Sequence, residues 1–252
     1  MRLNPSLFVF LLTLLAWPAL ADTSVEEPVR TLKAAYVEFA PYIYTGDDGQ
    51  ATGSVKQLSD RVARKAGYRL EWQALPIKRV KLYLQRGKVD LWLGIAGQPH
   101  LQPLIMETRV PLAKVTLSAY HRPYQSPVET IGDLRGQSLI LISGYSYLGL
   151  LEGVLADPGT QHDSAPNHEA GLKMLTMGRG DYLLNYDEPM KRALEKMPTI
   201  PLRRNPLFSR EATFLISRQA REPEVLVERL EKAYWALMEE EGNGPVTPDT
   251  LY

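Results

Sequence analysis

The chain has 252 residues, and its 29 basic and 29 acidic residues give a formal net charge of zero. This balance excludes the broad positive field on which nucleic-acid binding depends. The lack of cysteine in the sequence excludes disulfides, thiol catalysis and cysteine-ligated metals. With 44% hydrophobic and 23% charged residues, the composition is typical of a globular protein with one large domain or two lobes.

The N-terminal segment, residues 1–21, has the three parts of a secretory signal peptide. Arg2 supplies a positive start, the apolar run at residues 7–15 is too short to span a bilayer comfortably, and residues 19–21 read Ala-Leu-Ala, a small-x-small cleavage site. An uncleaved anchor is the alternative, but a helix-breaking proline follows the apolar run. We therefore expect the mature protein to begin at Asp22 and to reach the periplasm.

The first part of the mature chain alternates strand and helix patterns. In chain order, these patterns predict a strand at 32–37, a loop at 39–53, a helix capped by Ser54, a strand at 68–75, a helix starting at Pro76 and a strand from Leu91. The resulting β-α-β-α-β order predicts a parallel sheet with right-handed crossovers.

The second part begins after a long predicted strand at residues 114–120. A polar, proline-bearing stretch at 121–127 is the best first boundary between lobes. Beyond it, the patterns predict a strand at 138–142, a helix after Gly144, a helix at 167–177, a helix capped by Asp187, an irregular basic stretch at 203–210, a buried strand at 213–216 and a long final helix through Leu226 and Leu237.

One pattern, Leu-x-x-Gly-basic-x-Asp, occurs at residues 84–90 and again at 175–181. In each copy it closes a helix-like stretch and opens a strand-like run. Gly87 and Gly178 can take the left-handed conformation that ends a helix. The two copies predict two α/β lobes of similar construction, and the cleft between two lobes is a natural place for a ligand. The alternative is coincidence, because such junctions are common in α/β proteins.

The sequence carries few of the patterns that are typical of catalytic sites. The four histidines lack the spacing of metal ligands, residues 143–146 lack the nucleophile elbow of hydrolases, and the sequence has no glycine-rich phosphate loop. We therefore expect no cofactor, no metal and no catalytic residue.

The search for recognition residues is more productive, because ligands bind outside the carboxyl ends of strands in open α/β sheets. The candidates at three such strand ends are Tyr36, Glu38, Phe39 and Tyr42, then Gly94, Ile95 and Ala96, then Tyr145, Ser146 and Tyr147. For Tyr42 the alternative is that its side chain only packs the loop against its own lobe. The last three candidates would stand at a helix start, which suits an anion, although Ser146 could be an ordinary cap. Asp187 could be a cap or an acceptor for a cationic group.

Four short segments, taken together in order and spacing, resemble the family 3 extracellular solute-binding proteins, the polar amino-acid receptors of ABC importers. They are residues 36–42, 87–90, 133–136 and 178–181, and the resemblance covers roughly residues 32–238. It implies the type II periplasmic-binding fold, an α/β architecture with two lobes of mostly parallel sheet joined by two hinge strands. Lobe 1 would comprise residues 22–121 and 211–252, and lobe 2 residues 122–210.

The resemblance also implies roles for individual residues. Phe39 looks like the family's stacking aromatic, and Asp187 falls at or beside the acidic position that meets the ligand's amino group. The chain departs from the family after Gly97, where amino-acid receptors usually carry an arginine that clamps the ligand carboxylate. Here the segment ends in Gln102, which cannot replace a bidentate guanidinium. Arg79 could supply a substitute cation.

The resulting expectation is a monomeric periplasmic receptor that closes over a small polar, amino-acid-like ligand for an ABC permease. Two alternatives remain from the sequence. One is a dehydratase-like enzyme on the same fold with Glu38 or Asp187 as acid–base group. The other is an accessory binding protein for a membrane sensor, without a role in transport.

Overall fold

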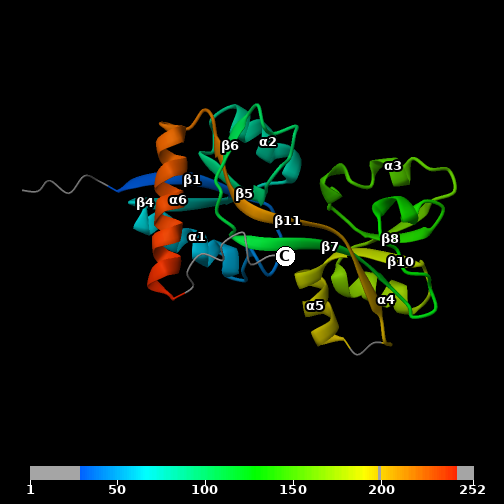
Figure 1. The fold of residues 1–252 in the computed structure, drawn as a ribbon. Coiled ribbons are helices and arrows are strands. Elements are labelled where there is room, and N and C mark those ends of the chain that lie inside the picture. The colour runs from blue at the N-terminus through cyan, green and yellow to red at the C-terminus, as the bar shows by residue number, and fades with distance from the viewer. Residues whose placement is uncertain (1–28, 198–199, 243–252) are drawn as a thin grey trace, which may run out of the picture.

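The computed structural model describes residues 29–197 and 200–242, and it shows two α/β lobes linked by two long strands, β7 and β11 (Figure 1). The predicted signal peptide lies outside the described residues. The strands are β1 Arg30–Tyr36, β2 Tyr44–Thr45, β3 Ala51–Thr52, β4 Tyr68–Ala74, β5 Leu91–Ile95, β6 Ile105–Glu107, β7 Ala113–His121, β8 Ser138–Ile142, β9 Gln161–Ala165, β10 Tyr182–Tyr186 and β11 Arg203–Ser217. The helices are α1 Ser54–Lys65, α2 Ile77–Gln85, α3 Glu152–Leu155, α4 His168–Thr176, α5 Asp187–Lys196 and α6 Pro223–Glu240, with 3₁₀ turns at Ile131–Leu134 and Tyr147–Gly149.

A single nine-stranded sheet runs through both lobes in the order β4-β1-β5-β11-β7-β10-β8-β9, with β6 paired to β11. In the first lobe β1 pairs in parallel with β4 and β5, as the β-α-β-α-β pattern predicts. In the second lobe β8 pairs in parallel with β9 and β10. The two-lobed α/β fold class is therefore confirmed.

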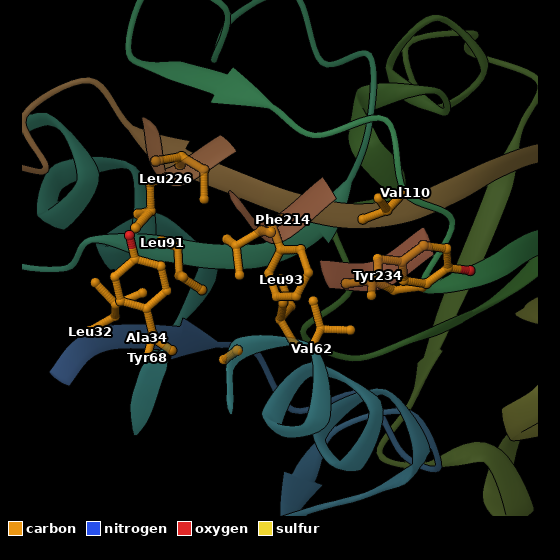
Figure 2. Close-up of a cluster of buried hydrophobic side chains, with 14 of the residues drawn as sticks. Leu32, Ala34, Val62, Tyr68, Leu91, Leu93, Val110, Phe214, Leu226 and Tyr234 are labelled. Atoms are coloured by element: carbon orange, nitrogen blue, oxygen red, sulfur yellow. The ribbon is translucent and has the colours of Figure 1, made fainter. Parts of the chain in front are cut away.

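The sheet of the first lobe is covered on both faces, because successive side chains of a strand point to opposite faces. Leu91, Leu93 and Phe214 face one side, where α1 and α6 pack (Figure 2). Trp92, between Leu91 and Leu93, and Leu215, next to Phe214, face α2 on the other side. Because both faces are covered, β5 and the second half of β11 are continuous apolar runs and do not alternate between apolar and polar residues.

The helix ends bear out the repeated pattern. Gly87 and Gly178 follow α2 and α4 with φ of 61° and 75°, the left-handed conformation that the pattern predicts. Asn167 caps α4 by accepting a hydrogen bond from the Ala170 amide at 2.8 Å.

Two predicted elements are wrong. Residues 203–210, predicted to be irregular, form the first half of β11, which pairs antiparallel with β7 and has a register irregularity between Pro206 and Phe208. These residues include several exposed, polar side chains, so they lack the apolar pattern that predicts a strand. The predicted helix after Gly144 also does not form as one unit, because only a three-residue 3₁₀ turn and the four-residue α3 follow.

Candidate functional site

A cavity of about 120 Å³ lies between the two lobes, beside the crossing strands. The first lobe contributes strand-end and loop side chains that include Glu38, Phe39, Tyr42, Trp92, Gly94, Ile95 and Gln98. The second lobe contributes the segment Gly144, Tyr145, Ser146, Tyr147 and Leu148, together with Tyr186 from the end of β10. Most of the predicted recognition residues therefore surround one space.

Aromatic rings connect the lobes across this cavity. Phe39 stacks on Tyr42 of its own lobe, with ring centroids 5.4 Å apart and planes at 25°. It also meets two rings of the second lobe edge to face, Tyr145 at 5.9 Å and Tyr186 at 5.1 Å. Pairs of this geometry stabilise by about 0.5–1.5 kcal/mol each beyond their buried area. Phe39 is thus the aromatic residue that both closes the cavity and links the lobes.

Three of the tyrosine rings are held by hydrogen bonds from their hydroxyls to the protein. The Tyr42 hydroxyl donates to the Lys114 carbonyl at 3.0 Å, and the Tyr145 hydroxyl lies 3.1 Å from His168 Nε2. The Tyr147 hydroxyl accepts from the Ile142 amide at 2.6 Å and donates to the Leu184 carbonyl at 3.2 Å. These bonds fix the rings before any ligand arrives.

Burial raises the pKa values of these three tyrosine hydroxyls and of the Tyr186 hydroxyl. It raises the pKa of Tyr42 to about 12, with further contributions from the negative charges of Glu188 and Asp187, and it raises the pKa of Tyr186 to about 12. The pKa values of Tyr145 and Tyr147 are also raised, mainly by burial. The cavity therefore presents uncharged aromatic rings at physiological pH.

Glu38 brings a carboxylate to the cavity, and its neighbours hold it in place. It accepts hydrogen bonds from the Thr45 amide at 2.9 Å and from the Thr45 hydroxyl. The Tyr36 hydroxyl lies 2.7 Å from the same Thr45 hydroxyl. Tyr36 itself is only 3% exposed, packs on Trp72 and does not line the cavity. The structure thus places Tyr36 behind Glu38, as a support rather than a contact.

The end of β5 leads into the segment where the sequence departs from the family that it resembles. Gly94 and Ile95 line the cavity, whereas Ala96 is outside the lining and its amide donates to the Glu211 carbonyl. Gln98, which is 7% exposed, does line it, and its amide nitrogen donates to the Ile95 carbonyl at 2.7 Å. Gln102 lies outside the lining, and its amide is 3.4 Å from Glu107.

The segment Gly144–Leu148 lines the cavity without being a helix start. Tyr147 and Leu148 have φ of 48° and 57°, which bulky residues rarely adopt. The prediction that a helix N-terminus at Tyr145 and Ser146 holds an anion is therefore wrong, because a three-residue 3₁₀ turn has no aligned dipole of useful length. The segment contributes rings and the Ser146 side chain instead.

Besides Tyr36 and Ala96, two further predicted site residues, Asp187 and Arg79, lie outside the cavity lining. Asp187 is the first residue of α5, follows the N-cap Tyr186 and makes no cap of its own. Its carboxylate accepts from Ser118 Oγ at 2.7 Å, from the Tyr120 hydroxyl at 2.8 Å and from Arg204 Nη1 at 2.7 Å, so it ties both crossing strands to α5. Arg79 is exposed on α2 and does not line the cavity.

Among the polar and aromatic lining residues, three were not predicted from the sequence: Tyr186, Gln98 and Trp92. Tyr186 ends β10, so the strand-end rule that selected Phe39 could have selected it as well. Trp92 packs in the core of the first lobe and also lines the cavity. Within the described part of the chain, no cluster of histidine, aspartate or glutamate could hold a metal, and no helix is both long and apolar enough to cross a bilayer.

Two α/β lobes, two crossing strands and an aromatic cavity between the lobes define the type II periplasmic-binding fold, and comparison with solved structures agrees. An ancestral arginine-binding protein bound to arginine superposes with a TM-score of 0.65 at 18% identity, over 86% of this chain and 96% of that one. A histidine kinase sensor domain with similarity to periplasmic binding proteins superposes with a TM-score of 0.67 at 20% identity, over 84% of this chain and 92% of that one. The resemblance drawn from the sequence is confirmed at the level of the fold.

One curated relative is also similar in sequence. The probable amino-acid-binding protein YxeM of Bacillus subtilis (strain 168) is 24% identical over 148 residues, which cover 58% of this chain. The match covers 54% of the relative, so the chain spans about half the length of that protein. No protein-family model matches the chain.

Proposed function

We propose that the protein is a periplasmic solute-binding protein whose two lobes close over a small, amino-acid-like ligand. The observation that carries the proposal is the contact of Phe39 in the first lobe with Tyr145 and Tyr186 in the second, at the wall of an interlobe cavity. A ligand that touches both lobes stabilises the closed arrangement over the open one. The amino-acid-binding relative and the arginine-binding structure support the ligand class.

The hinge in this proposal consists of β7 and β11. Both strands leave the first lobe, where β11 pairs with β5, and enter the second, where β7 pairs with β10. The network of Asp187 with Ser118, Tyr120 and Arg204 fixes the second lobe to these strands. We propose residues 122–210 as the moving lobe and residues 22–121 with 211–252 as its partner.

Both transport and sensing are compatible with such a closure. An ABC permease is the partner that the resemblance implies, and the likeness to a histidine kinase sensor domain favours a membrane sensor as the second candidate. The enzyme alternative rests on Glu38 alone, because Asp187 does not line the cavity. Incubation of a bound ligand with the protein, followed by mass spectrometry, distinguishes retention from conversion.

Lobe closure should be visible by energy transfer, because the chain has no native cysteine and introduced cysteines label cleanly. Lys81→Cys on α2 and Glu152→Cys on α3 place exposed labels on different lobes. We expect transfer between them to rise on addition of a ligand that co-purifies with the protein. A control pair, Lys81→Cys with Glu228→Cys, lies within the first lobe and should not respond. Equal responses of the two pairs would contradict hinge closure.

Export is tested separately. We expect N-terminal sequencing of protein from the periplasmic fraction to begin at Asp22, since residues 19–21 form the cleavage site. Membrane-bound protein that retains Met1 would contradict this.

A further inference from the structure

In the described part of the chain, the interlobe cavity is lined by a negatively charged side chain and by no positively charged one. Among the cavity-lining residues that the structure describes, Glu38 is the charged one, and no lysine, arginine or histidine side chain joins it. The polar side chains beside it are Gln98 and Ser146 together with the tyrosine hydroxyls, three of which already bond to the protein. A ligand in this space therefore meets one negative charge and no positive side chain.

The rings add to the same preference. Phe39, Tyr42, Tyr145, Tyr186 and Trp92 line the cavity, and their faces carry negative electrostatic potential. A cation within about 6 Å of such a ring is attracted to its face, most strongly where water is excluded. The tyrosine hydroxyls ionise only well above neutral pH, and burial raises their pKa values further, so the rings are uncharged near neutral pH. Several rings and one carboxylate together suit an organic ammonium group.

A ligand carboxylate finds no cationic side chain among the described residues that line the cavity. Burying a carboxylate without a cation or a set of donors is strongly unfavourable. Gln98 lines the cavity near the position where the resembled family usually carries its arginine. Its side chain is neutral and already donates a hydrogen bond to the Ile95 carbonyl. Arg79, the substitute considered from the sequence, is exposed and outside the lining.

From this arrangement, and resting on the proposed binding function, we propose that the ligand is an organic amine that carries no carboxylate. Glu38 and the aromatic rings bind its ammonium group, and the apolar walls cover its carbon chain. The protein would then bind an amine in preference to the corresponding amino acid, because the two differ only in the carboxylate.

Matched pairs test this directly by calorimetry: tyramine against tyrosine, and agmatine against arginine. We expect the amine of at least one pair to bind at least tenfold more tightly than its amino acid. Glu38→Gln should weaken that amine at least tenfold while leaving the shape of the site intact. Glu211→Gln removes the same charge from an exposed residue next to the lining residue Ala212, and should change affinity less than twofold.

The energy-transfer pair on α2 and α3 distinguishes failure of the amine inference from failure of the proposed closing receptor. If an amino acid binds as tightly as its amine and raises transfer, the amine inference is wrong and the closing receptor stands. If 4-ethylphenol, the uncharged analogue of tyramine, binds as tightly as tyramine, the ammonium is not recognised and the inference is again overturned. If none of these compounds gives binding heat, the amine inference is overturned. If in addition no co-purified molecule changes transfer, the closing-receptor function falls with it.

Discussion

Replacement of Phe39 by alanine should weaken ligand binding by about ten- to a hundredfold, which corresponds to ~1.4–2.8 kcal/mol. The reason is that Phe39 serves two interactions at once. Its ring lines the cavity, and it contacts Tyr145 and Tyr186 across the interlobe space. The substitution therefore removes a surface for the ligand and also part of what stabilises the closed arrangement, and apparent affinity falls with the population of closed molecules. Calorimetry with a ligand that binds the unaltered protein measures the change.

Phe208→Ala provides the matched control. Phe208 is half-buried against the core of the second lobe but does not line the cavity. Its replacement should lower stability without a comparable loss of affinity. If Phe39→Ala remains folded and binds as the unaltered protein does, Phe39 has no place in the site.

A second large effect is expected at Gly53, the residue before α1. Its φ of 116° and ψ of 165° lie in a region essentially restricted to glycine. A Cβ there would stand 2.4 Å from the Tyr42 carbonyl oxygen and 2.8 Å from that of Pro41, and both are backbone atoms that cannot rotate away. Gly53→Ala should cost about 3 kcal/mol or more, from strain and overpacking together. For a chain of this size that is a fall in Tm of roughly 6–12 °C.

Gly49→Ala is the control for backbone conformation alone. Gly49 also has a positive φ, 75°, but a Cβ on it would meet nothing within 4 Å. It should cost about 1–2 kcal/mol, the usual penalty for a left-handed residue with a side chain. Thermal unfolding of both variants gives the comparison, and equal Tm values would show that the crowding at Tyr42 is relieved easily. Because Gly53 sets the position of the Tyr42 backbone, we also expect Gly53→Ala to reduce ligand binding.

Asp187 follows a cavity-lining residue, Tyr186, but does not line the cavity itself. The sequence marked it as a cap or as an acceptor for a cationic ligand. In the structure its carboxylate is occupied by Ser118, Tyr120 and Arg204, from the two crossing strands. Its neighbour Tyr186 lines the cavity in its place. The shift by one residue matters because Tyr186 ends a strand and Asp187 begins a helix, so their side chains point in different directions.

The elements of the first lobe could be predicted closely because their signals are local. The apolar run of β5 is typical of a buried strand, and Val55, Leu58 and Val62 have the spacing of one helix face in α1. Gly87 and Gly178 marked two helix ends, since only a residue without a side chain takes that conformation freely. The strand-end rule then brought Glu38, Phe39 and Tyr42 to the cavity. Such signals depend on neighbours within a few residues.

The sequence by itself thus determined the α/β class, the two-lobed organisation, most helix and strand positions in the first lobe and the strand ends at which a cavity would form. Only the tertiary structure decided that the polar residues 203–210 complete a crossing strand, because that pairing with β7 joins residues more than 80 positions apart. It also decided which side chains face the cavity. Gln98 and Tyr186 enter it, whereas Arg79 and Asp187 do not, and the cavity is left with a single carboxylate among aromatic rings. Side-chain direction and charge balance at an interlobe space depend on how two separate parts of the chain meet, and no local pattern encodes that.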